Sequence, residues 1–91
     1  KKLHETKNWL VYQHPRPAYP LHLVLIPKKA YPDWMSIPAG DTEIFSEYLQ
    51  LTQDLIRERN LEQIGYRLIV NGGEYQEFPI FHIHLVSGKP L

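Results

Sequence analysis

Two histidines near the end of the chain have the type and spacing of a reactive pair. His82 and His84 alternate with apolar residues in the segment 80–86. Because successive side chains of a β-strand point to opposite faces, both imidazoles are expected on one face of a strand. The opposite face should turn toward the core and carries Phe81, Ile83 and Leu85. Imidazole titrates near neutral pH, so this pair can supply a nucleophile, a base or an acid.

Two other interpretations of the pair remain open on spacing alone. Both histidines can be polar residues on a solvated sheet face, or they can chelate a metal ion together with His22. No carboxylate lies at ligand spacing beside the pair, so a ligand set drawn from these residues is incomplete. We therefore favour an interpretation of the pair without a metal.

Four segments have the composition of β-strands and bring the histidine pair into a sheet. Proline, which cannot donate to a sheet, separates the first two, in the loop 14–20. The second segment is apolar at every position except His22, which is typical of a central strand. The predicted strands are residues 8–13, 21–26, 64–70 and 80–86.

One long helix is predicted between the second and third strands. It is expected to begin at Asp41 or Thr42, either of which can cap its first turn, and to end near Asn60. Apolar residues at three- and four-residue steps form a stripe that should be buried. The members of the stripe are Phe45, Tyr48, Leu49, Thr52, Leu55 and Ile56. This order of elements predicts an α+β domain, with an antiparallel sheet of about four to five strands and one long helix on a face.

Length and composition limit the classes of protein. The 91 residues fit one small domain, residues 1–91, which can be a fragment of a longer chain. The formal net charge of +0 gives no long-range field for nucleic acid or an anionic membrane, so neither is an expected partner. The chain has no cysteine, which excludes disulfides and agrees with a cytoplasmic location. No apolar run is long enough to span a bilayer, and the charged start is not that of a signal peptide.

Several motifs, taken in order, resemble those of the histidine-triad (HIT) family. The segment around His82 and His84 resembles the family signature, in which three histidines alternate with apolar residues on the last core strand. The resemblance covers about residues 8–88. Further matches lie upstream in the family's order: the proline loop 15–20, His22 just before the apolar run 23–29 that contains Ile-Pro-Lys, the segment 66–71 ending in Asn71, and Gln76 six residues before His82.

The resemblance implies a fold, an activity and a set of residues. It implies a HIT-like enzyme that cleaves a nucleoside 5′-phosphoramidate or a related nucleotidyl bond through a nucleotidyl-histidine intermediate. His82 takes the place of the nucleophile, His84 would stabilise the phosphoryl charge, and His22 would support both. Substrate binding would fall to Asn71, Gln76 and His14. The resemblance also implies a purine nucleoside phosphate as ligand, a homodimer, and no metal or other cofactor.

Four positions depart from the family pattern. Ile80 stands where the first histidine of the triad belongs, and Glu77 stands where a small hydroxyl residue lies near the phosphate. His14 replaces an acidic residue that grips the ribose, and Ala30 replaces a frequent histidine. These departures keep a second hypothesis open, a family member that binds nucleotide or a protein partner without turnover.

Overall fold

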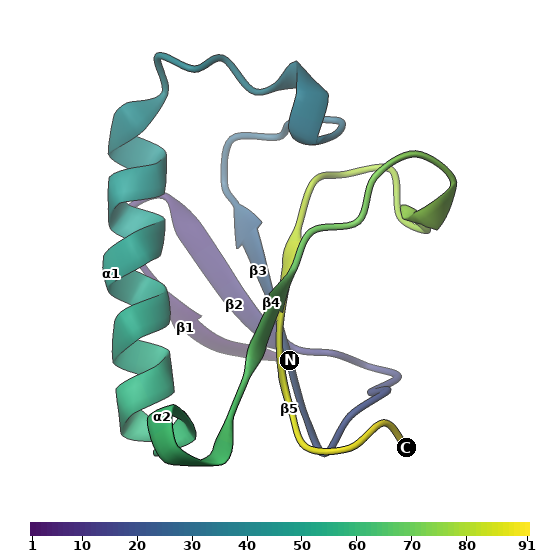
Figure 1. Cartoon of the computed structure of the whole chain (residues 1–91). Helices are drawn as coiled ribbons and strands as arrows, with labels where there is room; N and C mark the ends of the chain where they lie inside the picture. The colour runs from purple at the N-terminus through teal and green to yellow at the C-terminus, as the bar shows by residue number, and fades with distance from the viewer.

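The computed structural model describes all residues, 1–91, as a five-stranded antiparallel sheet with one long helix packed on one face (Figure 1). The strands lie side by side in the order β1-β2-β3-β5-β4. Their bounds are β1 Lys2–Glu5, β2 Trp9–Gln13, β3 Leu21–Pro27, β4 Arg67–Ile69 and β5 Ile83–Ser87. The predicted fold class, an α+β domain with an antiparallel sheet and a single long helix, is confirmed.

The helix α1 (Thr42–Glu58) begins where the sequence predicts and ends two residues early. Asn60 adopts a left-handed conformation, with φ of 57°, which separates α1 from the short helix α2 (Leu61–Ile64). Asp41 occupies the cap position, but its carboxylate accepts hydrogen bonds from the Tyr31 hydroxyl and from Lys29 Nζ instead of the helix amides. The predicted cap is therefore a tether between α1 and the loop after β3.

The buried stripe of α1 differs from the prediction at one place. Leu49 is 57% exposed, whereas Leu51, which the stripe omitted, is 4% exposed. The prediction spaced its apolar positions correctly, but the helix face that meets the sheet is centred nearer to Leu51, Leu55 and Thr52. Leu49 is left on the surface.

Three strand boundaries also differ from the prediction. β1 was missed because all of its side chains are exposed, so the segment carries no apolar pattern. β4 begins at Arg67 because Ile64 closes α2 and Gly65 follows with φ of 110°. β5 begins at Ile83, so His82 precedes the strand instead of lying within it.

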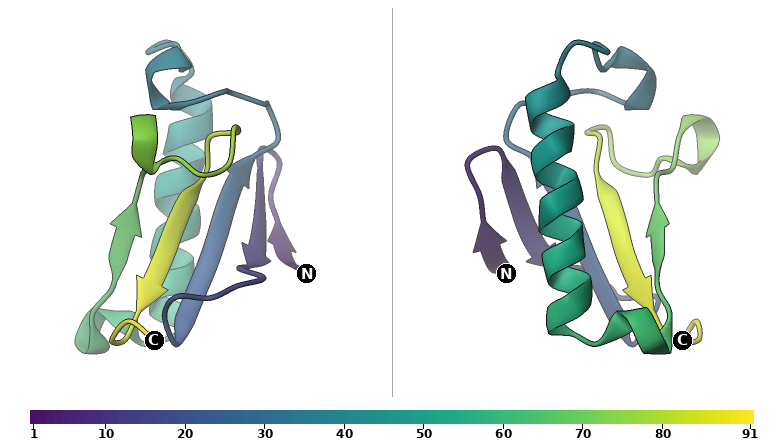
Figure 2. Two further views of the ribbon diagram at one scale, coloured as in Figure 1. Left: turned by 90° about the vertical axis from the view of Figure 1, so that its right-hand side faces the viewer. Right: turned by 60° about the vertical axis from the view of Figure 1, so that its left-hand side comes forward.

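The core lies between α1 and one face of the sheet, and the other face carries no helix (Figure 2). Alternation along the strands decides which residues are buried: Trp9 and Val11 of β2, Leu23 and Leu25 of β3, and Ile83 and Leu85 of β5 all face α1. Phe81 joins the same cluster, which confirms the predicted core face of the last strand. The residues between them in each strand therefore project from the open face.

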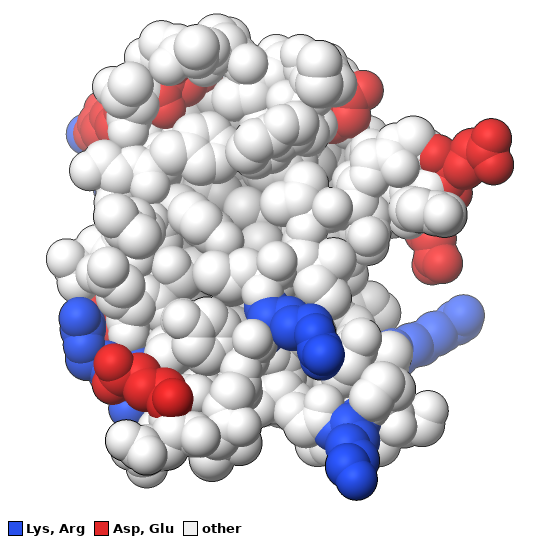
Figure 3. Space-filling view, viewed as in Figure 1, with Lys and Arg blue, Asp and Glu red and all other residues white.

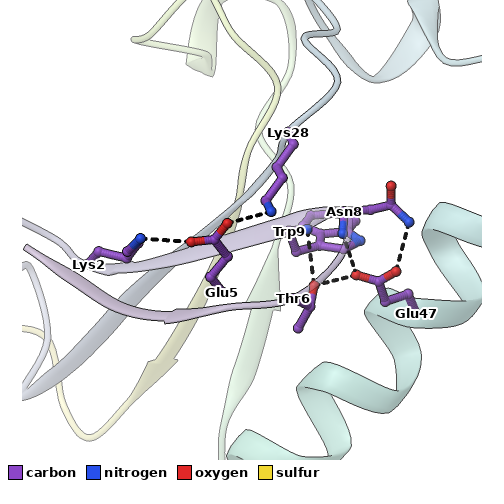
Figure 4. Close-up of polar contacts among 7 residues, drawn as sticks. All are labelled: Lys2, Glu5, Thr6, Asn8, Trp9, Lys28 and Glu47. Atoms are coloured by element: carbon purple, nitrogen blue, oxygen red, sulfur yellow. Dashed lines mark hydrogen bonds and ion pairs between the residues drawn. The ribbon is translucent and has the colours of Figure 1, made fainter.

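Glu47 of α1 ties the β1–β2 hairpin to the helix (Figure 4). Its two carboxylate oxygens accept hydrogen bonds from the backbone and side-chain nitrogens of Asn8, both at 2.8 Å, and from the Thr6 hydroxyl. Thr6 in turn accepts from the backbone N–H of Trp9 at 3.0 Å. These bonds fix the start of β2, the strand that leads to His14.

Candidate active site

The open face of the sheet brings three histidines together from neighbouring strands. The β2–β3 register places His14, just beyond β2, opposite His22, and the His14 backbone N–H donates to the His22 carbonyl at 2.9 Å. His84 of β5 pairs with Val24, so it lies diagonally from His22 on the same face. The His22 and His84 rings meet through His22 Nε2 and His84 Nδ1, which are 2.8 Å apart. The structure thus brings His22 and His84 into contact, and their catalytic roles stay predictions.

The hydrogen bonds of His22 and His84 define which ring nitrogens carry protons. The Ala18 backbone N–H donates to His22 Nδ1 at 3.0 Å, so that nitrogen must present a lone pair. In a neutral His22 the proton is then on Nε2, and it is donated to His84 Nδ1. His84 Nδ1 acts as acceptor, so the proton of a neutral His84 is on Nε2. The chain Ala18, His22, His84 therefore leaves one N–H donor free at its end.

Burial keeps the two inner histidines neutral. Burial lowers the pKa of His84 to about 4, with a further contribution from the neighbouring imidazoles of His82, His22 and His14. The pKa of His22 is also lowered, first by burial and then by the proximity of His14. At pH 7 both rings are thus uncharged, as the hydrogen-bonded chain requires.

The lowered pKa of His84 predicts a loss of stability in acid. An unfolded imidazole titrates near its ordinary value of 6.5, so on acidification the unfolded chain takes up the proton before the folded chain does. The stabilisation that the neutral His84 ring gives the folded state is complete above pH 6.5, and it is lost as the pH falls toward about 4. Because His84 is partly exposed, we expect a decrease in Tm of about 5 °C over this window. Thermal unfolding of wild type and of His84→Gln measures it; an equal decrease in both proteins would contradict this assignment.

His82 is hydrogen-bonded differently from His22 and His84. Its Nδ1 lies 2.8 Å from the carbonyl oxygen of Ile80, and because a carbonyl only accepts, Nδ1 carries the proton. Nε2 of neutral His82 then presents an unshared pair. The His82 ring is edge-on to the His84 ring, with centroids 4.8 Å apart. Ile80 therefore orients the His82 ring through its backbone carbonyl, a contact that does not need a histidine side chain there.

A groove of about 510 Å³ opens beside His82 on the helix-free face. Its floor comes from the open-face residues of β2 and β3, with His14 at one side and His82 at the other. The remaining wall is formed by the segment that leads to His82. The lining residues are Lys1, Tyr12, Gln13, His14, Pro15, Val24, Ile26, Glu77, Phe78 and His82. A mainly apolar floor with imidazoles at its edge suits a flat heterocycle attached to an anion.

The predicted substrate-binding residues Asn71 and Gln76 have different surroundings. Extending the β4–β5 register beyond Ile69 and His84 places Asn71 across from His82, where it is half-buried. Gln76 Nε2 donates to the Pro32 carbonyl at 2.8 Å and to the Phe78 carbonyl at 2.9 Å. Its donors thus hold the β4–β5 connection, and donation to a phosphate would require these bonds to break. The roles of both residues in binding remain predictions.

The histidines that could hold a metal ion are not the set weighed from the sequence. His14, His22 and His84 offer ligand atoms that lie within 4.8 Å of one another, whereas His82 is outside this group. The backbone N–H of Arg16 donates to His14 Nδ1 at 3.0 Å, as that of Ala18 does to His22 Nδ1. If the Nε2 atoms bound a metal ion, the ring protons would have to move to the Nδ1 atoms. There they would face the backbone N–H groups that now donate to Nδ1. The hydrogen bonding therefore fits a metal poorly.

Two parts of the site were not identified from the sequence. The backbone groups of Ala18 and Ile80 fix the histidine tautomers, and a backbone group acts regardless of its side chain. Val24 and Ile26 line the groove because they alternate with the core residues of β3, although an all-apolar strand does not reveal which face is open. Residue types alone could not reveal the backbone groups. The open-face residues of β3 could have been found once His22 was assigned to the site.

Comparison with known proteins agrees with this fold. A HIT domain family model matches residues 1–91. A HIT-like protein of Chlamydia pneumoniae is 33% identical over 93 residues, covering all of this chain and 84% of the relative. The crystal structure of a HIT family hydrolase from Legionella pneumophila superposes with a TM-score of 0.89 at 32% identity, covering 97% of this chain and 80% of that one. A histidine triad protein from Clostridium difficile gives 0.88 at 30% identity, with coverages of 99% and 80%.

The chain belongs to the HIT domain family. A more distant relative is the purine nucleoside phosphoramidase of Escherichia coli, 27% identical over 77 residues, which are 82% of this chain and 65% of that protein. None of the helices is long and apolar enough to cross a membrane.

Proposed function

We propose that this protein hydrolyses nucleoside 5′-phosphoramidates, or transfers their nucleotidyl group, with His82 as nucleophile. The observation that carries the proposal is the hydrogen bond from His82 Nδ1 to the Ile80 carbonyl at 2.8 Å, which leaves Nε2 unprotonated beside an open groove. The activity of the Escherichia coli relative, a purine nucleoside phosphoramidase, supports the choice of substrate. The apolar groove floor suits a purine base.

The reaction proceeds by two displacements in this proposal. His82 Nε2 attacks the α-phosphorus and forms a P–N bond, while the bond from phosphorus to the substrate nitrogen breaks. The departing nitrogen keeps the bonding electron pair and takes up a proton from solvent. Water then attacks the phosphorus, the bond to His82 breaks, and His82 recovers its electron pair as the nucleoside monophosphate and a proton leave.

In this proposal His22 and His84 stabilise the negative charge that develops on the phosphoryl group. The Nε2–H of His84 is free because its Nδ1 accepts from His22 Nε2, 2.8 Å away, and His22 is held in turn by the Ala18 amide. A fixed neutral donor close to His82 can bond a non-bridging phosphoryl oxygen as negative charge increases there. In this proposal His14 would bond the ribose hydroxyls, which its position lining the groove on the β2 side supports.

Phosphorus NMR of adenosine 5′-phosphoramidate tests this proposal. Wild type should convert the compound to AMP, and His82→Ala should not. Conversion by wild type would also show that Ile80 is tolerated at the first triad position. Absence of conversion together with tight nucleotide binding would favour the second hypothesis, a binding domain without turnover.

We also propose that the chain forms a homodimer through β4. This strand ends the sheet, so its outer backbone edge is unpaired. On the α1 side of that edge three apolar residues are exposed instead of covered: Tyr66, Leu68 and Val70. A twofold axis along the edge would pair β4 with β4 of a second copy and cover these side chains in one continuous sheet.

Sedimentation of edge variants tests the assembly. Leu68→Lys places a charge in the proposed interface and should convert a dimer to a monomer, because an unpaired buried charge is strongly unfavourable. Leu3→Lys is the matched control, since Leu3 is an exposed leucine on β1, the strand at the opposite edge. A monomeric wild type, or loss of the dimer only in Leu3→Lys, would contradict the proposal.

A further inference from the structure

A second groove lies where the loop after β3 meets the start of α1. It has a volume of about 450 Å³, and its apolar lining comes mainly from Trp34, Met35, Ile37 and Phe45. In Figure 1 this loop passes above the sheet and leads down into α1. The groove shares no residue with the one beside His82. The proposed reaction therefore gives it no role.

The apolar floor of this second groove is held in place by the core. The Trp34 ring packs against the rings of Phe45 and Phe81, with centroids 6.3 Å and 5.9 Å away. Phe81 belongs to the core cluster, and Phe45 packs against it. Even so, Trp34 is 51% exposed and its neighbour Met35 is 87% exposed. Large apolar side chains that are adjacent, exposed and already ordered are typical of a binding surface, because ordering them on binding costs little.

Acidic residues surround the second groove. The loop after β3 and the first turn of α1 contain no arginine and no lysine beyond residue 29. The carboxylates of this stretch belong to Asp33, Asp41 and Glu43. Lys29 pairs with Asp41 at 3.2 Å and Lys7 pairs with Glu43 at 2.9 Å, whereas Asp33 pairs with no cation.

The β4–β5 connection adds two carboxylates at the same end of the molecule. Gln76 Nε2 donates to the Pro32 carbonyl at 2.8 Å, so this connection lies against the loop after β3. Its acidic residues, Glu74 and Glu77, are exposed and make no ion pair. Figure 3 shows acidic side chains around the upper end of the molecule and basic side chains mainly in its lower half. Carboxylates thus outnumber cations at this end, although the formal net charge of the whole chain is +0.

We infer that the second groove docks a basic segment of another protein. Apolar side chains of that segment fill the groove, and flanking lysine or arginine side chains face the surrounding carboxylates. The apolar contacts supply the affinity, and the complementary charge supplies the selectivity. The same carboxylates would be repelled by an anionic membrane surface, which favours a protein partner.

Three hexapeptides with the same apolar centre test this inference. Each has Leu-Phe in the middle, flanked on both sides by two lysines, two glutamines or two glutamates. They are titrated into ¹⁵N-labelled protein at low ionic strength and followed by amide chemical shifts. The lysine peptide should bind about threefold to tenfold more tightly than the glutamine peptide, the size of a few partly exposed charge pairs, and the glutamate peptide should bind most weakly. The largest shifts should fall within residues 33–45, and added salt should reduce the preference.

Matched variants separate the apolar contribution from the charged one. Met35→Lys places a cation in the groove and should weaken binding of the lysine peptide by about tenfold or more. Leu49→Lys makes the same change at an exposed leucine of α1 that does not line the groove, and it should keep the wild-type affinity. Asp33→Asn retains an acceptor for the Ser36 backbone N–H, so the turn is preserved. It should reduce the preference for lysine over glutamine by about twofold.

The same experiments decide against the inference if they fail. Equal affinity for the three peptides, no binding of any of them, or shifts confined to the groove beside His82 would overturn it. A second copy of this chain is the competing occupant, and sedimentation without peptide tests it. An assembly that Met35→Lys dissociates and Leu49→Lys keeps would assign the groove to self-association instead. None of these measurements depends on turnover, so their outcome is independent of the proposed function.

Discussion

His82→Ala should lose turnover of adenosine 5′-phosphoramidate by about 10³-fold or more while the fold is retained. His82 supplies the only unprotonated imidazole nitrogen that the hydrogen bonds leave free beside the groove, because its Nδ1–H is held by the Ile80 carbonyl. Without that nitrogen the covalent intermediate cannot form. The measurement is kcat by phosphorus NMR or by a coupled assay for AMP.

Two controls make the loss specific to the nucleophile. His4→Ala removes an exposed histidine of β1, outside the site, and should keep the wild-type rate. The affinity of His82→Ala for AMP should change by only a few fold, since the groove floor is intact. A rate in His82→Ala within tenfold of wild type would exclude His82 as nucleophile.

His22→Ala should lower kcat by about 10- to 100-fold, the second largest expected effect. His22 Nε2–H fixes His84 with its Nδ1 as acceptor and its Nε2 as donor. Without this partner His84 can place its proton on either nitrogen, so its donor is oriented for phosphate only part of the time. His22 acts through His84, so it is a positioning residue.

The pH dependence distinguishes positioning from a structural role. The neighbouring imidazole of His22 is among the causes that lower the pKa of His84, so its removal should shift the acidic limb of the kcat profile toward higher pH. His22→Gln, which retains a donor of similar reach, should recover part of the rate. A loss of rate in His22→Ala with an unchanged pH profile and no recovery in His22→Gln would show that His22 serves only the packing.

The alternation of apolar and polar residues predicted the strand in which one face is buried and the other is not. Phe81, Ile83 and Leu85 were assigned to the core because apolar and polar residues alternate there, and all three are buried. The same rule placed His82 and His84 on a common face, whereas His22 was assigned to the site by the family resemblance. It failed for β1, where all side chains are exposed and no apolar alternation marks a buried face.

The sequence indicates candidate residues for the site, but it does not predict their hydrogen bonds. His82 was expected within a strand, but it lies just before β5, where its ring can bond back to the Ile80 carbonyl. Its orientation depends on the local path of the backbone, which residue types do not specify. The Ile80 carbonyl, and not its side chain, contacts the His82 ring, and the effect of Ile80 on the rate stays a prediction.

The covalent mechanism requires that a nucleotidyl group becomes bonded to His82, so trapping that intermediate is the decisive experiment. Wild type mixed with excess adenosine phosphoramidate is quenched at alkaline pH, since a phosphorus–imidazole bond is labile in acid, and analysed by mass spectrometry after proteolysis. An adenylyl group should be added to the peptide that contains His82, and none should be added in His82→Ala. An adenylyl group on another residue, or turnover by wild type through a single displacement with inversion at phosphorus, would contradict it.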